Sequence, residues 1–385
     1  MAIEEEDKPY SYRESGFQRI DNIISWCEKY GLKCILDLHN PLGRRFGGDS
    51  RLWKEEGYRE RLIKVWDKLS LRVKDRGAIA YDLFNEPEPP ENNYFIWNDL
   101  AKRLIETIRK NDKIHPIIVE SINYATTDDI SKLEDFEDNI VYSFHFYSPS
   151  KFTMQKVPWF KNEEETEYPG IIDGEEWNIK TIEEKLSNAI KVSQERKVPL
   201  FCGEFSCADT APLMDGLLYL ADLLKVFSEN RISWAYYNYL YRTINEYWKD
   251  RFNWNLFIYY IPEKRLNSFT HKVNILKFFA SEALGEVLSI AKERADNINI
   301  YGVKSIDDKV ELLIWNENSE DIFIQLLFAN ISPNLKANVL FMNNAYGQFN
   351  FWESASLSDN RLLLEIPGKT FMKIEIPIKD YSLIF

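Results

Sequence analysis

The sequence has 385 residues, and 45% of them are hydrophobic, which allows a large buried core and excludes a disordered chain. The net charge of −13 argues against a nucleic-acid partner, because the phosphates would be repelled. The chain has no apolar run of about 18 residues and opens with the acidic segment Met1–Lys8, so we expect neither a membrane span nor a signal segment, and the compartment stays open.

Apolar runs alternate with amphipathic segments between about residues 18 and 285, which is typical of βα units. Spacings of three and four predict helices over 58–74, over 97–110 and from 182, where Thr181 and Glu184 form a capping box. A further helix is expected at 272–283. The predicted strands are Leu32–His39, Ile79–Asn85, Pro116–Glu120, Ile140–Tyr147, Leu200–Glu204 and Ile232–Tyr239.

These six strands predict most of an eight-stranded α/β barrel, which we assign to residues 1–284. After Gly285 the apolar residues recur with period two between Asn, Asp, Gly and Pro turns. This pattern predicts a small antiparallel β-sandwich over residues 285–385. A stabilising accessory role is the first expectation for the sandwich, and a carbohydrate-binding module is the alternative.

Two glutamates close predicted barrel strands. Glu86 follows the run from Ile79, and Glu204 follows the run from Leu200. Reacting groups of a barrel of parallel strands lie at the C-terminal ends, and a pair of carboxylates there is the minimum set for cleaving a glycosidic bond. The plainer alternative is that each glutamate only marks the point where a strand leaves the core.

Polar neighbours at other strand ends favour the functional reading. They are His39, Asn85, His145 and Tyr147. The chain has only four histidines, and two of them fall at predicted strand ends beside the carboxylates. The four cysteines show neither a disulfide framework nor zinc-site spacing, so we expect no metal and no cofactor.

This set resembles glycoside hydrolase family 5, the cellulase family of the clan of retaining α/β-barrel glycosidases. The matching motifs, in chain order, are Asp37-Leu38-His39, Arg44-Arg45-Phe46-Gly47-Gly48, Asn85-Glu86-Pro87, His145-Phe146-Tyr147 and Gly203-Glu204-Phe205. They fall within residues 18–240, and their order and spacing make the resemblance specific.

The resemblance implies a role for each matching residue. It implies that Glu86 is the acid/base and Glu204 the nucleophile, with their carboxyl groups about 5–5.5 Å apart. It also implies that Asn85 binds the sugar 2-hydroxyl, that Tyr147 orients Glu204, and that His145 and His39 line the sugar site.

The sequence departs from the family pattern at two places. Only about 31 residues precede the Leu32 strand, so the first two strands of the barrel, and an arginine that pairs with the nucleophile, are expected to be missing. We expect an upstream segment, or a second copy of the chain, to fill that gap. In addition, Tyr237 stands where the family usually has a tryptophan beneath the cleaved sugar.

Aromatic residues on the predicted loops are candidates for sugar stacking, with a plain loop-core role as the alternative. They are Trp159, Trp177 and Trp248. The substrate predicted for the chain is a β-linked glucan polysaccharide or oligosaccharide, cleaved as by an endo-β-1,4-glucanase. Mannan, a glycolipid headgroup, and a non-catalytic carbohydrate-binding remnant of such an enzyme remain as alternatives.

Overall fold

The chain forms two compact units, which are described separately here from a computed structural model. The first unit comprises Met1–Phe146, Glu184–Phe205 and Ile232–Ala235, and the second comprises Tyr147–Glu183, Ser206–Arg231 and Tyr236–Phe385. The structure describes residues 3–44, 50–77, 79–136, 139–157, 160, 164–208, 210–237, 272, 275–282, 285–288, 297–305, 309–328, 335–342, 349–357 and 361–377. Among these residues, no helix is both long and apolar enough to span a membrane.

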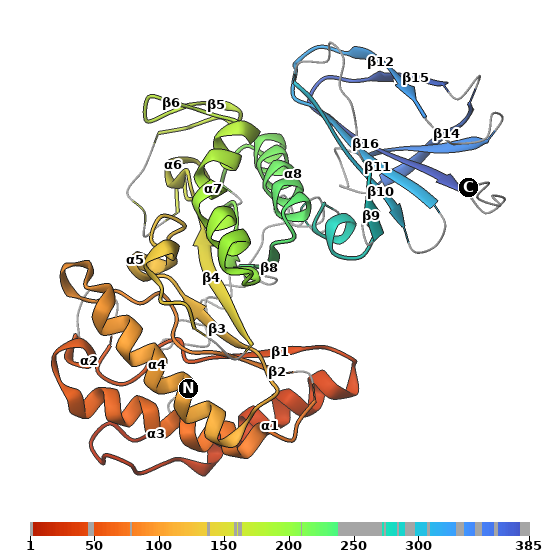
Figure 1. Cartoon of the computed structure of the whole chain (residues 1–385). Helices are drawn as coiled ribbons and strands as arrows, with labels where there is room; N and C mark the ends of the chain where they lie inside the picture. Colours follow the sequence, from red (N-terminus) through yellow and green to blue (C-terminus); the bar gives the residue numbers. More distant parts are fainter. Residues whose placement is uncertain are drawn as a thin grey trace, which may run out of the picture. The chain divides into compact units, whose positions relative to one another are not determined.

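A six-stranded sheet organises the first unit, with strand order β1-β2-β3-β4-β7-β8 (Figure 1). Its registers from β1 through β4 to β7 are parallel. This is the sheet of a (β/α)8-type barrel that lacks its first two strands, as predicted from the sequence. The strands are β1 (Cys34–Asp37), β2 (Ile79–Asp82), β3 (Ile117–Glu120), β4 (Ile140–Phe146), β7 (Leu200–Phe205) and β8 (Ser233–Tyr236).

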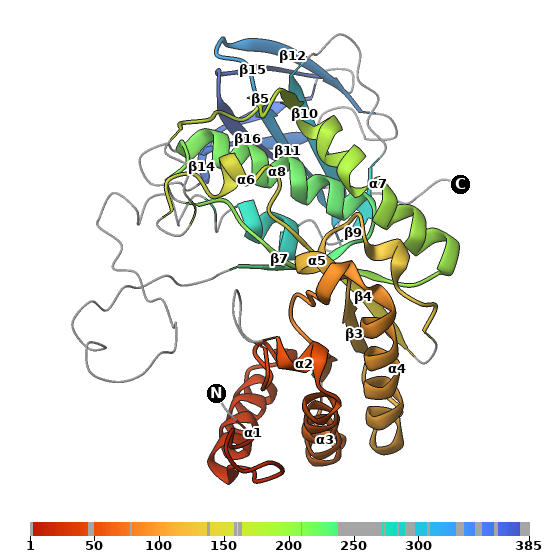
Figure 2. The same ribbon diagram turned by 90° about the vertical axis from the view of Figure 1, so that its left-hand side faces the viewer.

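Helices cover the sheet, and two buried tryptophans attach them to strand ends. Helices α3 (Glu56–Val73) and α4 (Tyr94–Asn111) lie side by side (Figure 2). Trp66 of α3 donates its indole N–H to the carbonyl of Leu83 at 3.1 Å. Trp97 of α4 donates to the carbonyl of Glu120 at 2.8 Å. These bonds hold the ends of β2 and β3 in place, next to the polar residues that follow them.

One predicted helix boundary is wrong, and the long helix at Leu213–Glu229 is not among the predicted helices. Helix α7 begins at Ile179, before the expected capping box at Thr181 and Glu184. Asn178 caps it instead, since its side-chain oxygen accepts the N–H groups of Lys180 at 2.9 Å and Thr181 at 3.4 Å. The other helices and short strands are α1 (Glu14–Lys29), α2 (Arg51–Lys54), α5 (Ile122–Ala125), α6 (Ser150–Thr153), α7 (Ile179–Arg196), α8 (Leu213–Glu229), β5 (Gly170–Ile172), β6 (Glu175–Trp177) and the π-helical turn η3 (Phe278–Glu282).

Antiparallel strands form the β-sandwich of the second unit. One sheet has the order β14-β13-β16-β11-β10-β9, and β12 pairs with β15 in a second sheet. Alternate residues of β15 are buried, as the period-two pattern predicts, and they enter a core that includes Leu364, Ile314 and Ile374. The strands are β9 (Gly285–Val287), β10 (Ile298–Ser305), β11 (Lys309–Asn316), β12 (Ile322–Leu327), β13 (Lys336–Met342), β14 (Phe349–Ser356), β15 (Arg361–Ile366) and β16 (Thr370–Pro377).

A buried acid connects α8 to the sandwich within this second unit. Asp222 of α8 accepts hydrogen bonds from the hydroxyl of Tyr168 at 2.7 Å and from the indole N–H of Trp315, in β11, at 3.0 Å. Asn299 of β10 donates to the same carboxyl at 3.4 Å. Because α8 and the sandwich belong to one compact unit, the division at residues 284 and 285 stays a prediction.

Candidate active site

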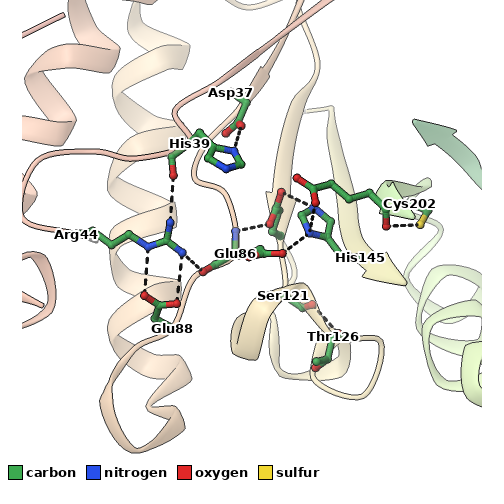
Figure 3. Close-up of polar contacts among 11 residues, drawn as sticks. Asp37, His39, Arg44, Glu86, Glu88, Ser121, Thr126, His145 and Cys202 are labelled. Atoms are coloured by element: carbon green, nitrogen blue, oxygen red, sulfur yellow. Dashed lines mark hydrogen bonds and ion pairs between the residues drawn. The ribbon is translucent and has the colours of Figure 1, made fainter. Parts of the chain in front are cut away.

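Three ionisable side chains meet at the C-terminal ends of β2, β4 and β7. Glu86 follows β2, His145 lies in β4 and Glu204 lies in β7. Each of them has a nitrogen or oxygen atom within 4.8 Å of such an atom of the other two. Nδ1 of His145 is 2.8 Å from Glu86 and 3.8 Å from Glu204 (Figure 3). The two glutamates predicted to act together therefore share one site.

Three carboxylates surround the imidazole of His145. Its Nδ1 faces Glu86 and Glu204, and its Nε2 lies 3.4 Å from Glu120. Burial of the ring would lower the pKa of His145, but the carboxylates of Glu120, Glu86 and Glu204 outweigh this effect and raise it well above its usual value. The ring is thus held as an imidazolium, whose charge offsets the repulsion between the acids.

Glu86, His145 and Glu204 are close enough to offer ligand atoms to a cation. Ligation requires a neutral histidine, because the metal takes the lone pair of a ring nitrogen. The high pKa of His145 favours the protonated form, which donates hydrogen bonds to the acids.

Glu86 has a left-handed backbone with φ of 49°, which L-residues rarely adopt. Its peptide is bound on both sides. The N–H donates to Oε2 of Glu120 at 2.6 Å, and the carbonyl accepts a hydrogen bond from the guanidinium of Arg44 at 2.9 Å (Figure 3). These bonds fix the direction in which the Glu86 side chain leaves the strand end.

Arg44 is a buried residue that joins two strand ends. Its guanidinium also donates to the carbonyl of His39 at 3.1 Å and pairs with Glu88 at 3.3 Å. The group stands 5.3 Å from the ring centre of Phe84. Arg44 comes from the loop that resembles the third loop of the family, of which Arg45 to Gly48 lie outside the described residues.

His39 lies two residues beyond β1 and is partly exposed. Its Nδ1 is 2.9 Å from Oδ2 of Asp37. Burial lowers the pKa of His39, but Asp37, with smaller contributions from Glu204 and Glu86, raises it overall. His39 is therefore within electrostatic reach of both predicted catalytic acids, and its role in lining the sugar site stays a prediction.

Asn85 precedes Glu86 and is 3% exposed. Its amide nitrogen has no hydrogen-bond partner among the described residues. A buried donor without a partner is costly, so this amide is available to a ligand oxygen at the strand end. The contact to a sugar hydroxyl that the family resemblance implies for Asn85 stays a prediction.

Gly203 allows β4 and β7 to approach closely beside the site. A Cβ atom at this position would lie 3.0 Å from Nε2 of His145 and 3.1 Å from the hydroxyl of Ser143. The register between the two strands also shifts between Phe144 and His145. Glycine therefore precedes Glu204 because a larger residue would push His145 away from the acids.

Five further residues were predicted to bind sugar, and the structure describes three of them. Tyr147 follows β4 and is half-buried, and Tyr237 follows β8 and is 40% exposed. Both belong to the second unit, so their predicted roles at the site stay predictions. Trp177 is 4% exposed, which favours its loop-core alternative. Trp159 and Trp248 lie outside the described residues.

Sequence reasoning missed two buried acids next to the site, Glu120 and Asp82. Burial, with repulsion from Glu120 and Asp37, raises the pKa of Asp82 well above its usual value. Glu120 contacts both Glu86 and His145. The signal that was available is the one that identified Glu86, because Glu120 also closes an apolar strand with a carboxylate.

The chain is similar to known proteins over the part that contains this site. A sequence profile described as Cellulase (glycosyl hydrolase family 5) matches residues 2–242. Endoglucanase C of Acetivibrio thermocellus is 30% identical over 276 residues, which cover 65% of this chain and 80% of the relative. Cellodextrinase A of Ruminococcus flavefaciens is 32% identical over 234 residues, which cover 57% and 66%.

Solved structures agree with the fold. The crystal structure of endoglucanase Cel5A from the hyperthermophilic Thermotoga maritima superposes with a TM-score of 0.53 at 25% identity. The match covers 60% of this chain and 72% of that chain. A hyperthermophilic endo-β-1,4-glucanase in complex with substrate superposes with a TM-score of 0.55 at 22% identity, covering 64% and 79%, and supports the fold alone.

Proposed function

The chain belongs to glycosyl hydrolase family 5, the cellulase family, and on this basis we propose that it cleaves β-linked glucan chains with retention of configuration. The observation that carries the proposal is the approach of the Glu86 and Glu204 carboxyl oxygens to within 4.8 Å. Retaining enzymes hold their two carboxyl groups about 5–5.5 Å apart, whereas inverting enzymes need about 6.5–9.5 Å to admit a water molecule.

In the first step of the proposed reaction, a carboxylate oxygen of Glu204 attacks the anomeric carbon. The bond from that carbon to the leaving oxygen breaks, and Glu86 gives its proton to this oxygen. A covalent glycosyl-enzyme remains. In the second step Glu86 removes a proton from water, the water oxygen attacks the anomeric carbon, and the ester bond to Glu204 breaks.

The surroundings of the two acids support a shared site. Nδ1 of His145 lies 2.8 Å from Glu86 and 3.8 Å from Glu204, so one ring contacts both acids. The free amide of Asn85 is suited to the sugar 2-hydroxyl, a contact that strengthens as charge develops on the ring in the transition state. The names of the relatives favour a glucan over mannan or a glycolipid headgroup.

A non-catalytic carbohydrate-binding remnant is the second candidate, because the described sheet begins at β1 and does not include the strand whose arginine is expected beside the nucleophile. Arg44 does not obviously replace it, since its guanidinium is engaged with Glu88 and with the carbonyls of Glu86 and His39. The intact grouping of both glutamates around a buried His145 favours the enzyme, because a binding remnant has no need to hold two acids around an imidazolium.

We also propose that a further polypeptide segment covers the free edge of β1. Apolar residues of α1, of β1 and of the link between them are exposed, including Trp26 at 60%, Ile35 at 43% and Leu32 at 58%. No described strand pairs with that edge. Residues 3–13 do not fill it, because Glu4 pairs with Arg61 of α3 at 3.0 Å. An upstream segment is the favoured source, and a second copy of the chain is the alternative.

The stereochemistry of the product tests the proposed mechanism directly. The full chain is incubated with cello-oligosaccharides, and the anomer released first is identified by proton NMR. Retention requires the β-anomer as the first product, and an α-anomer would overturn the mechanism. Trapping with 2,4-dinitrophenyl 2-deoxy-2-fluoro-β-cellobioside should release dinitrophenolate and add one 2-deoxy-2-fluoro-cellobiosyl group, a disaccharide, to the peptide that contains Glu204, as read by mass spectrometry.

A further inference from the structure

One buried carboxylate controls the placement of both the peptide and the side chain of Glu86. Oε2 of Glu120 accepts the Glu86 backbone N–H at 2.6 Å. Oε1 of the same carboxylate lies 3.4 Å from Nε2 of His145. The other ring nitrogen of His145 lies 2.8 Å from Oε1 of Glu86. The three residues therefore form a closed ring of polar contacts that begins and ends at Glu86.

The bond to the Glu86 N–H matters because of the backbone at that residue. A φ of 49° is strained for an L-residue and persists only when its surroundings hold it. If the N–H lost its acceptor, the peptide would be free to relax toward an ordinary conformation, and the carboxyl of Glu86 would swing away from its present position. Small displacements of a reacting group are costly in rate.

Glu120 is itself rigid and shielded. It is 1% exposed at the end of β3, and its own carbonyl is bound by the indole of Trp97 at 2.8 Å. The next residue, Ser121, donates its N–H to the carbonyl of Ser143 in β4 at 3.1 Å. These hydrogen bonds hold the backbone at Glu120 in place. Because the Glu120 carboxylate is buried, a sugar cannot reach it, and it cannot act as an acid or base toward a substrate.

We propose that Glu120 is a positioning residue that orients the acid/base Glu86 through its backbone N–H and through His145. The inference rests on the proposed function, because it assigns Glu120 a part in the proton transfer that Glu86 performs. It adds the end of β3 to the set of strand ends that build the site.

Three substitutions separate the hydrogen bond from the charge. Glu120→Gln keeps the length and an acceptor oxygen for the Glu86 N–H but removes the charge. Glu120→Asp keeps the charge but is one methylene shorter, so the carboxylate no longer reaches that N–H. Glu120→Ala removes both. Because Gln keeps the bond to the Glu86 N–H but loses the second acceptor oxygen that faces His145, the proposal predicts a smaller loss of activity for Gln than for Asp and Ala.

The assay compares two substrates that differ in their need for an acid. Cellotetraose has a poor leaving group, and 2,4-dinitrophenyl β-cellobioside has a good one that leaves without a proton. For Asp and Ala we expect kcat/KM on cellotetraose to fall roughly 100-fold, while kcat/KM on the activated substrate changes little. On the activated substrate kcat and KM should fall together, because the second step still needs Glu86 as base.

A double variant tests whether Glu120 acts through Glu86. Adding Glu120→Ala to Glu86→Ala should cause no further loss on the activated substrate. Asp112→Asn is the matched control, because Asp112 is as buried as Glu120 but lies beyond the opposite end of the same sheet, bound to Tyr81 at 2.6 Å. It should lower the melting temperature without changing the ratio of the two substrates.

The outcomes separate the two proposals. The role of Glu120 is overturned if Glu120→Asp lowers kcat/KM equally on both substrates, or if Glu120→Gln loses more activity than Glu120→Asp. In either case the proposed function still stands if the loss in Glu86→Ala depends on the leaving group. If Glu86→Ala shows no such dependence, the proposed function itself fails. The Gln and Asp variants keep the test decisive if the Ala variant does not fold.

Discussion

Nδ1 of His145 lies 2.8 Å from Oε1 of Glu86, so the buried imidazolium is closest to the acid that is proposed to exchange protons with the substrate. The positive ring can donate a hydrogen bond to Glu86 and still balance the charge of the neighbouring acids. This relationship links the protonation of one histidine both to the stability of the fold and to the geometry of the site.

The first prediction concerns the pH dependence of stability. The folded pKa of His145 is raised above its usual value of 6.5, so its contribution is complete below about pH 6.5 and is lost as the pH rises through the folded pKa. Urea unfolding measured across this range should show a decline in stability that is absent from His145→Gln. Parallel pH profiles for the two proteins would contradict the assignment.

The second prediction concerns the two acids. Glu204→Gln should abolish turnover on every substrate, because no nucleophile remains. Glu86→Ala should lose about 10²–10⁴-fold on cello-oligosaccharides but much less on substrates with good leaving groups. Steady-state kinetics on both substrate classes measures this contrast. Equal losses for Glu86→Ala on the two classes would mean that the roles are assigned wrongly.

The third prediction concerns the close approach of β4 and β7. Gly203→Ala places a Cβ atom 3.0 Å from His145, so the ring must move away from the acids. We expect a stability loss of about 1–3 kcal/mol from overpacking, together with reduced activity. Gly57→Ala is the control, because a Cβ atom there meets nothing within 4 Å and α3 should gain about 0.4–1 kcal/mol. Unchanged activity in Gly203→Ala would contradict this account.

The fourth prediction concerns a buried cluster away from the site. Asp112 is buried, which would raise its pKa, but hydrogen bonds from Tyr81, His115 and backbone N–H groups lower the pKa to about 2. Its contribution to stability is therefore present above its ordinary pKa of 3.8 and is lost as the pH falls toward 2. Asp112→Asn should lower the free energy of unfolding by about 1–3 kcal/mol at neutral pH. It should also reduce the further fall in that free energy as the pH is lowered below 3.8. An unaltered fall over this pH range would contradict this prediction.

The fifth prediction concerns the free edge of β1. The exposed apolar residues there should make the isolated chain associate, and light scattering on the purified protein measures this directly. Replacing the exposed residues Leu32 and Ile35 with lysine should reduce association without altering the buried core. A monomer that unfolds cooperatively before any replacement would contradict the proposal that a further segment is needed.

Strand positions were predictable because each of the six strands is a short apolar run, and all six predicted strands are present. Four of them, β2, β3, β4 and β7, are also largely buried, whereas β1 and β8 are not. The strand ends were less predictable, because a strand ends where its backbone turns, and an apolar run does not record that turn. The run from Ile79 stays apolar beyond Asp82, yet β2 ends there, and Glu86 turns into a left-handed conformation. Helix α7 begins directly after Asn178, whose side chain caps it. The spacing of Thr181 and Glu184 matched a capping box, so the sequence placed the start of the helix too late.

The candidate site was predictable only for residues that a family motif contains. Glu86, Glu204 and His145 meet as expected. Glu120 closes an apolar strand as Glu86 does, but no family motif contains it, and its bond to the Glu86 N–H, 34 positions away, could not be read from the sequence. Contacts of this kind depend on which strands become neighbours, and a single sequence does not record them.

The hydrogen bonds at Asp222 bear on how this protein can be divided experimentally. Cutting the chain at the predicted boundary would remove Trp315 and Asn299, two donors to this acid, while leaving the carboxyl on α8. Burial raises the pKa of Asp222 well above its usual value. In the truncated chain this carboxyl would become exposed to water, or would stay buried in its protonated form with fewer hydrogen-bond donors. The sandwich therefore supplies hydrogen-bond donors to a buried acid of α8, and we expect α8 and the sandwich to unfold in a single thermal transition.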